Sequence, residues 1–168
     1  DTLRSRGLGD VYKRQETDHP AVAVLYTTCN DFVPKSLLSC VHLNYPNYTV
    51  YVLDDSSQVR YRDEIDRYAA QFENVVVIRR DDRRGFKAGN LNHALDTVVT
   101  EPYFVIADSD EILPRNFLEQ LVPRIEADPS CGFIQASHRC VPQGTQLQRD
   151  LCRGIDVHWK WYQPLRNR

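Results

Sequence analysis

The sequence lacks the features that mark membrane-spanning, secreted and zinc-binding proteins. No apolar run approaches the ~20 residues that a membrane helix requires, and no charged-then-apolar signal segment opens the chain. The five cysteines are odd in number, widely scattered and never spaced as CxxC, which argues against a zinc or dithiol site. We therefore expect a soluble chain whose cysteines are free thiols in a reducing compartment.

An excess of charge of one sign is also missing. Lys plus Arg (21) nearly balances Asp plus Glu (23), so no basic field argues for a nucleic-acid partner. The sequence has no GxGxxG after its first apolar run, where TTCNDF stands instead, which argues against a Rossmann dehydrogenase. What is present is a chain of 168 residues, 42% of them hydrophobic, which suffices for one ordinary core.

The two ends of the chain look abrupt. The stretch SRGLGDVYKRQ resembles the translation of a sequencing adapter, so we expect residues 1–15 to be an artefact of that kind or a disordered arm, with natural sequence starting near Glu16. A helical pattern from Gly154 stops without a cap. We expect residues 16–168 to form an incomplete domain that exposes apolar surface where the remainder would pack.

Between these ends, apolar runs typical of buried parallel strands alternate with segments of helical periodicity. Pro34 suits the first position of a helix, and Asn30 or Asp31 is placed to cap it. The pattern predicts strands over residues 21–28, 48–55, 74–80, 103–108 and 131–137, and helices over residues 34–41, 60–72, 87–98 and 114–125.

This alternation predicts a three-layer α/β domain, a mostly parallel sheet with helices on both faces. Ligands of such sheets bind beyond the carboxyl ends of the strands. Three of the predicted strands end in polar or acidic groups, which should converge on one edge: Thr27, Thr28 and Asp31, then Asp54 and Asp55, then Asp108 and Asp110.

Asp108 and Asp110 are the candidate metal ligands. Two carboxylates at positions i and i+2 of a strand end can share a hard cation such as Mg²⁺ or Mn²⁺, which keeps positions open for substrate phosphates. The structural alternative is that Asp108 or Ser109 caps the helix from Pro114, while Asp110 and Glu111 are solvated.

Asp54, Asp55 and Lys87 also have two readings. LDDSS is a good turn and cap sequence, and Lys87 at a helix start is either solvated or faces an anion bound at that helix terminus. Together these features indicate a nucleotide-diphosphate site: the acids can bind a cation, the lysine and the helix amides can bind phosphate, and the acids lie at strand ends.

Four blocks in order carry a family resemblance: TTCND, NYPNYTVYVLDDSS, GFKAGNLNHAL and FVIADSDEIL. They resemble the donor-binding half of family 2 glycosyltransferases of the GT-A fold, a Rossmann-like fold of nucleotide-diphospho-sugar transferases. KAGNLN is similar to the processive, cellulose synthase-like branch. The resemblance covers about residues 21–168.

The resemblance implies roles for individual residues. Asp108 and Asp110 resemble the DxD pair that holds a divalent cation, Mg²⁺ or Mn²⁺, on the donor diphosphate. Asp54 or Asp55 resembles the acid that contacts uridine, and Lys87 resembles the diphosphate contact.

Four further positions match the family motifs less well. Thr28 and Asp31 stand where the family often has a tyrosine-asparagine-glutamate segment, so here the aromatic stack on the base is absent. Gln135 and His138 resemble a strand that borders the donor sugar, although a lone histidine there is as easily structural.

By resemblance, the longer protein transfers a hexose from a UDP-sugar to a glycan with inversion, at the cytoplasmic face of a membrane reached through other segments. Inversion needs a general base, which in the family lies in a TED-like motif followed by QxxRW. Neither motif occurs in this sequence, so no catalytic residue is assigned and the chain is expected to bind donor and metal without turnover. The aromatic residues Trp159, Trp161 and Tyr162 begin either an acceptor platform or an amphipathic helix.

Two other classes remain open at this stage. A haloacid dehalogenase-type phosphatase also carries DxD after a strand, but after the first one in the chain, whereas DSD follows the fourth. A nucleotide-binding module without chemistry agrees with the missing general base.

Overall fold

The structure is a computed structural model that describes residues 19–140 and 145–162, so the segment 1–15 and Leu165 lie outside it. The chain divides into two units, Asp1–Val122 and Pro123–Arg168, which are described separately. The elements in chain order are β1 (Val22–Thr28), α2 (Pro34–Val41), β2 (Tyr48–Asp54), α3 (Val59–Ala69), β3 (Val75–Ile78), α4 (Phe86–Thr97), β4 (Tyr103–Asp108), α5 (Phe117–Ala127), α6 (Gln146–Val157) and the π-helical turn η2 (His158–Tyr162).

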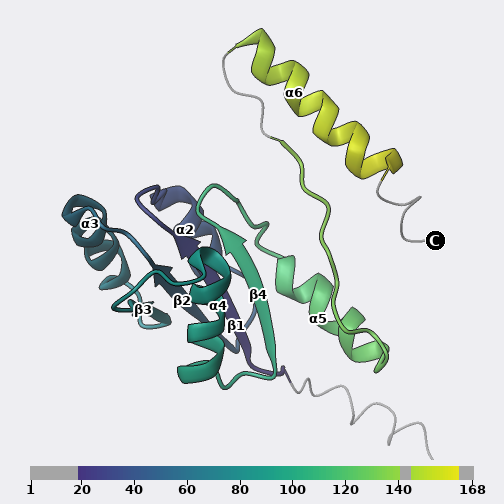
Figure 1. Cartoon of the computed structure of the whole chain (residues 1–168). Helices are drawn as coiled ribbons and strands as arrows, with labels where there is room; N and C mark the ends of the chain where they lie inside the picture. Colours follow the sequence, from purple (N-terminus) through teal and green to yellow (C-terminus); the bar gives the residue numbers. More distant parts are fainter. Residues whose placement is uncertain (1–18, 141–144, 163–168) are drawn as a thin grey trace, which may run out of the picture. The chain divides into compact units, whose positions relative to one another are not determined.

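The first unit is built on a four-stranded sheet in the order β3-β2-β1-β4 (Figure 1). All three strand pairs are parallel, as the alternation of strands and helices predicts. The register places Thr28 of β1 beside Asp54 of β2, and Thr27 beside Asp108 of β4. Three strands therefore end at one edge of the sheet.

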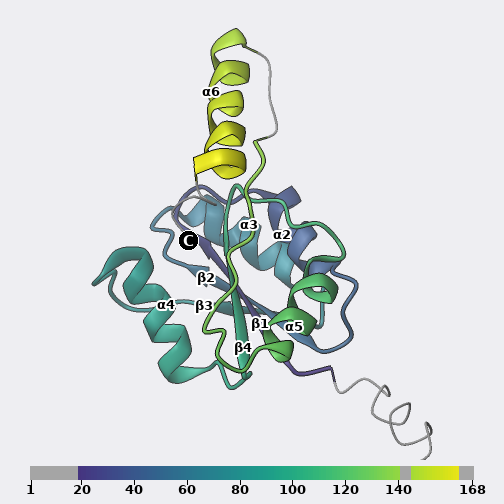
Figure 2. The same ribbon diagram turned by 90° about the vertical axis from the view of Figure 1, so that its right-hand side faces the viewer.

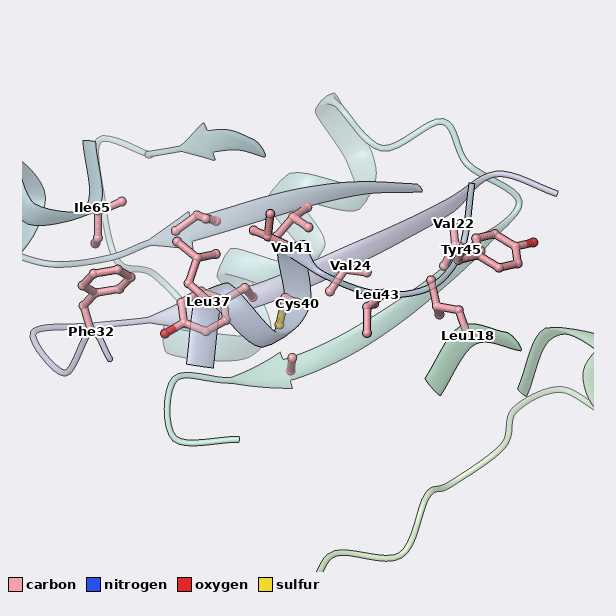
Figure 3. Close-up of a cluster of buried hydrophobic side chains, with 14 of the residues drawn as sticks. Val22, Val24, Phe32, Leu37, Cys40, Val41, Leu43, Tyr45, Ile65 and Leu118 are labelled. Atoms are coloured by element: carbon pink, nitrogen blue, oxygen red, sulfur yellow. The ribbon is translucent and has the colours of Figure 1, made fainter. Parts of the chain in front are cut away.

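Helices cover both faces of this sheet, which confirms the three-layer prediction. On one face, β1 and β2 pack against α2 through Leu37, Cys40 and Val41, with Ile65 of α3 and Leu118 of α5 in the same core (Figure 3). Burial raises the pKa of the Cys40 thiol to about 12, so this cysteine is a neutral core residue.

In the described part of the first unit, α4 covers the opposite face, and Figure 2 shows α4 and α2 on opposite sides of the sheet. Ala94 of α4 is buried against β1 and β2, with Leu91 and Leu95 beside it, as the sequence predicts. On the neighbouring strand β4, Phe104 and Ile106 remain exposed.

The second unit corrects two predictions. Residues 131–137 form no strand, because no strand in the described part of the chain pairs with them, and Phe133 is exposed. An apolar run alone does not make a strand without a ladder partner. Cys140 and Cys152 form a disulfide with a Cα–Cα distance of 5.0 Å, so the expectation of five free thiols is wrong for this pair. Cys29, Cys40 and Cys131 are free.

Helix α6 begins with a capping box, in which Thr145 and Gln148 exchange hydrogen bonds between side chain and backbone. Its apolar residues Leu147, Leu151 and Ile155 are exposed. Among the described residues, no helix combines the length and the apolar character that crossing a bilayer demands.

Candidate functional site: a polar cavity at the strand ends

A cavity of about 560 Å³ opens at the carboxyl edge of the sheet. Its walls come from the loops after β1, β2 and β4 and from the first turns of α4, all within the first unit. The lining residues are Thr27, Thr28, Cys29, Asp31, Asp55, Arg83, Phe86, Lys87, Asn90, Asp108, Ser109 and Asp110. The structure thus confirms that polar residues at the ends of β1, β2 and β4 lie close together at one edge of the sheet.

Asp108 connects three of these elements. Its Oδ1 accepts a hydrogen bond from Thr27 Oγ1 of β1 at 3.0 Å and is in direct contact with Lys87 Nζ of α4. The reading of Asp108 or Ser109 as the cap of the next helix is wrong, because α5 begins only at Phe117. The Asp108 carboxylate is half exposed and faces the cavity, where a ligand can reach it.

Asp31 lies on the β1 side of the cavity. Its Oδ1 accepts hydrogen bonds from Thr28 Oγ1 at 2.9 Å and from the Cys29 amide at 2.7 Å. Burial acts to raise the pKa of this carboxyl, but the hydrogen bonds from Cys29, Ser109 and Thr28 outweigh burial and lower it. Asp31 is therefore held in its ionised form.

The predicted caps of α2 are wrong, because both side chains bind elsewhere. The residue before α2 is Val33, which has no capping side chain. Asp31 closes its own turn, whereas Asn30 Oδ1 accepts from the amides of Ser57 and Gln58, which precede α3. Asn30 thereby ties the loop after β1 to the loop after β2.

The structure separates the neighbours Asp54 and Asp55. The side chain of Asp54 is fully buried, accepts from Arg79 Nε at 2.7 Å and from the Ser56 amide at 2.8 Å, and does not line the cavity. Arg79 also pairs with Asp66 of α3. Asp54 therefore supports the fold beneath the site.

Asp55 lines the cavity and is paired on both oxygens. Arg80 Nε donates to Oδ1 at 2.9 Å, and Arg80 Nη2 donates to Oδ2 at 2.7 Å. The exposed fraction is 8% for the arginine side chain and 5% for the aspartate side chain. These hydrogen bonds, which Arg80 donates to the Asp55 carboxylate, raise the pKa of Arg80, as expected for a bidentate ion pair.

The segment that leads into α4 has an unusual backbone. Gly85 (φ 72°) and Phe86 (φ 48°) are consecutive left-handed residues, and glycine adopts this conformation far more readily than phenylalanine. A Cβ at Gly89 would lie 1.9 Å from Arg84 O, so only glycine permits this approach. The turn aims Lys87 into the cavity from the N-terminal end of α4.

Sequence reasoning missed several residues at this site, among them Arg80, Phe86 and Asn90. Asn90 is 2% exposed, lines the cavity, and its Oδ1 has no hydrogen-bond partner in the part of the chain that the structure describes. The only available signal was its place within KAGNLN. Nothing in the polar string RRDDRR indicates which arginine binds Asp55.

Gln135 and His138 lie in the second unit, on the irregular segment before α6. The His138 ring stacks on the Trp159 ring with the centroids 5.1 Å apart and an interplanar angle of 21°. Neither residue is among those that line the cavity of the first unit.

Comparison with solved structures shows which proteins share this fold. The chain superposes on a mannosyltransferase, PcManGT from Pyrobaculum calidifontis, in complex with GDP-Man and Mn²⁺, with a TM-score of 0.61 and 29% identity over 76% of this chain and 37% of that one. S. aureus TarS 1-349 matches with a TM-score of 0.56 and 18% identity over 76% of this chain and 42% of that one, which shows a shared fold alone.

Curated relatives point the same way. Putative cellulose synthase 2 of Komagataeibacter xylinus is 32% identical over 143 residues, which are 82% of this chain and 9% of the relative. Cellulose synthase 2 of Novacetimonas hansenii is 33% identical over 146 residues, 84% of this chain and 9% of the relative. The chain thus spans about a tenth of the length of these relatives.

A family model agrees with the motifs and the topology. The model of glycosyl transferase family 2 matches residues 22–168, from β1 through the last residue. This match argues against the phosphatase alternative, which places its DxD after the first strand. The chain belongs to glycosyl transferase family 2.

Proposed function

We propose that the chain binds a UDP-sugar, together with Mg²⁺ or Mn²⁺, in the cavity at the strand ends. The observation that carries the proposal is the convergence there of two acids after β4, an ionised acid after β1 and a lysine at the start of α4. The 29%-identical mannosyltransferase, in complex with GDP-Man and Mn²⁺, supports a nucleotide-sugar and a divalent cation as the ligands.

The residues at the cavity fit a divalent cation that also needs the phosphates of the substrate as ligands. Asp108 and Asp110 both line the cavity, and the described residues contain no group of three or more His, Cys, Asp or Glu able to hold an ion alone. Two carboxylates plus substrate phosphates are the ligand set that Mg²⁺ prefers, and Mn²⁺ accepts the same oxygen ligands. When bound, the cation supplies charge stabilisation to the departing diphosphate.

Lys87 and the start of α4 act on the same diphosphate. A lysine in the first turn and the N-terminal end of a helix both favour an anion. Lys87 contacts Asp108 at the cavity. The positive group that would bind the diphosphate therefore already lies beside the negative group that would bind the cation. We assign Lys87 to phosphate binding.

We place the nucleoside between the β1 side of the cavity and the first turns of α4. Asp31 is ionised, Thr28 holds it in place, and Asn90 presents an unused buried acceptor. The donors that a uridine diphosphate offers to these acceptors are its ribose hydroxyls and the uracil N–H. Asp55 contributes through its pair with Arg80, whereas Asp54 serves the fold beneath it.

For the longer protein we propose hexosyl transfer to a glycan acceptor with inversion at the anomeric carbon. An acceptor hydroxyl attacks opposite the nucleotide, the bond to the diphosphate breaks, and a general base takes the hydroxyl proton. No residue of this chain is assigned as that base, so residues 16–168 are proposed as a donor-binding part that does not turn over by itself. Gln135 and His138 are proposed to border the donor sugar. Anchoring at the cytoplasmic face of a membrane belongs to the same proposal.

The test is calorimetric titration of the chain with UDP, with and without Mn²⁺. The Asp108→Ala, Asp110→Ala double variant should lose the metal-dependent binding. The matched control is Asp63→Ala, Asp96→Ala, which removes the same charge from exposed positions on α3 and α4 outside the cavity. Equal binding by wild type and the double variant, or no UDP binding by a folded wild type, would contradict the proposal.

A further inference from the structure

Phe86 combines two unfavourable features at the rim of the cavity. Its side chain is 73% exposed, although a phenylalanine ring is among the most favourable groups to bury. Its backbone is left-handed, which for a bulky residue is a genuine outlier and persists only where the surroundings hold it. Strain of this kind concentrates at ligand-binding sites.

The surroundings of Phe86 hold it firmly. Arg80 Nη2 donates to Phe86 O at 2.8 Å and Arg80 Nη1 donates to Arg84 O at 2.7 Å, while the same guanidinium pairs with both oxygens of Asp55. Gly89 N donates to Gly85 O at 2.9 Å. Hydrogen bonds therefore fix the backbone on both sides of the ring. Because this backbone is already ordered, ligand binding costs little of its conformational entropy.

Phe86 is also chemically distinct within the cavity. Among the lining residues that the structure describes, it is the only aromatic one, and most of the others are charged or hydrogen-bonding. A nucleoside diphosphate has a charged diphosphate, a hydroxylated ribose and one flat π surface, its base. Of these three parts, the base is the one that an aromatic ring binds most favourably, because the two flat faces can stack without any hydrogen-bond partner.

We propose that the Phe86 ring is the stacking surface for the nucleotide base. This inference rests on the proposed function and adds a residue to it, on a different element from TTCND. Arg80 is then a positioning residue, which acts through the Phe86 and Arg84 carbonyls. Stacking tolerates any base, so Phe86 contributes affinity for the base while the hydrogen-bonding residues select which base is bound.

The experiment compares UDP with pyrophosphate, both in the presence of Mn²⁺, on the whole chain. Phe86→Ala should weaken UDP binding by about 5- to 100-fold, the range that loss of one base stack produces. Pyrophosphate affinity should stay within about 2-fold, because pyrophosphate has no base. Phe86→Leu should behave nearly like Phe86→Ala, and Phe86→Tyr should restore UDP binding.

Two further measurements test whether the ring contacts the base or the sugar, and whether ligand binding changes the fluorescence at position 86. UDP and UDP-glucose should lose the same factor in Phe86→Ala; a loss confined to UDP-glucose would assign the ring to the sugar and overturn the inference. In Phe86→Trp, UDP should quench indole fluorescence beyond any change in the wild type, which itself contains Trp159 and Trp161.

The failures are separable. If wild type binds UDP with Mn²⁺ and Phe86→Ala binds it equally, the stacking role is wrong and the proposed function stands. If UDP and pyrophosphate weaken together in Phe86→Ala, Phe86 only supports the Lys87 turn and the inference is wrong. If folded wild type binds no UDP in the presence of Mn²⁺, the proposed function fails and this inference fails with it.

Discussion

Lys87 Nζ contacts Asp108 Oδ1 directly, so a cation that binds Asp108 through this oxygen has to replace the lysine as its partner. The same event frees the ammonium for the diphosphate that arrives with the cation. The pair is half exposed on both sides, which keeps its own contribution to stability small.

This exchange predicts opposite effects of Lys87→Met on two ligands. Mn²⁺ alone should bind the variant at least as tightly as the wild type, because Asp108 has lost its competitor. UDP with Mn²⁺ should bind about 10-fold more weakly or worse, because a charge-assisted contact to phosphate is gone. Calorimetry of both ligands checks this, with Lys35→Met on α2 as the charge-matched control. Weaker binding of Mn²⁺ alone would contradict the exchange.

Asn90→Leu is predicted to separate stability from binding. The free protein should become about 1 kcal/mol more stable, because a buried oxygen without a partner is replaced by an apolar group of similar size. UDP affinity should fall about 10-fold, since the ligand loses an acceptor. Urea denaturation and titration measure the two effects. Asn92→Leu, an exposed position on the same helix, should change neither; a destabilised Asn90→Leu protein would show that Asn90 has a structural partner after all.

Removing Arg80 should expose how much the fold depends on the pair with Asp55. Arg80→Ala leaves the buried carboxylate with only the half-exposed Arg83, whose Nε lies 4.0 Å from Asp55 Oδ2, and should cost about 3 kcal/mol in urea denaturation. Arg80→Lys should recover part of this, because it restores the charge without the bidentate geometry. Arg153→Ala, which breaks the exposed pair with Asp150, should cost no more than about 0.5 kcal/mol. Similar costs for the two alanine variants would refute the buried-pair argument.

Two glycines should respond in opposite directions to alanine. Gly89→Ala places a methyl group against Arg84 O and Arg80 Nη1 and should destabilise the first unit by about 3 kcal/mol. Gly154→Ala lies on an exposed face of α6, where a Cβ meets nothing within 4 Å, and should stabilise that helix by about 1 kcal/mol. Thermal unfolding followed by circular dichroism measures both changes, and a tolerated Gly89→Ala would mean that the loop relaxes.

The Asp31 carboxyl should titrate below its ordinary value of 3.8. Because the folded-state pKa is lowered, Asp31 stabilises the fold above about pH 4 and loses that contribution as the pH falls through the folded pKa. Thr28→Val removes one hydrogen bond and should move the pKa back toward 3.8, whereas Thr49→Val should not. Carbon-13 NMR of the carboxyl measures this, and a wild-type pKa at or above 3.8 would disprove the assignment.

The parallel sheet and its site edge were predictable because their signals are local. All seven residues of β1 are buried, and the strand begins with a continuous apolar run whose change to polar residues at Thr27 marks where it ends. Strand direction then brings Thr28, Asp55 and Asp108 to one edge without any further information.

Three of the failures depend on partners that lie outside the local segment. A strand over residues 131–137 requires a neighbour, and pairing Cys140 with Cys152 requires the chain to return to itself. Asp54 and Asp55 are adjacent and chemically identical, so only the positions of Arg79 and Arg80 distinguish the fold-supporting acid from the one at the cavity.

The bidentate ion pair between Arg80 and Asp55 has a consequence for inhibitor design. Both carboxylate oxygens are already taken, so an amine or amidine directed at Asp55 would have to displace an arginine before gaining anything. The amide oxygen of Asn90 has no such competitor. An inhibitor of this chain should therefore carry a neutral N–H or O–H directed at Asn90 and an aromatic ring that stacks on Phe86, and it should not target Asp55.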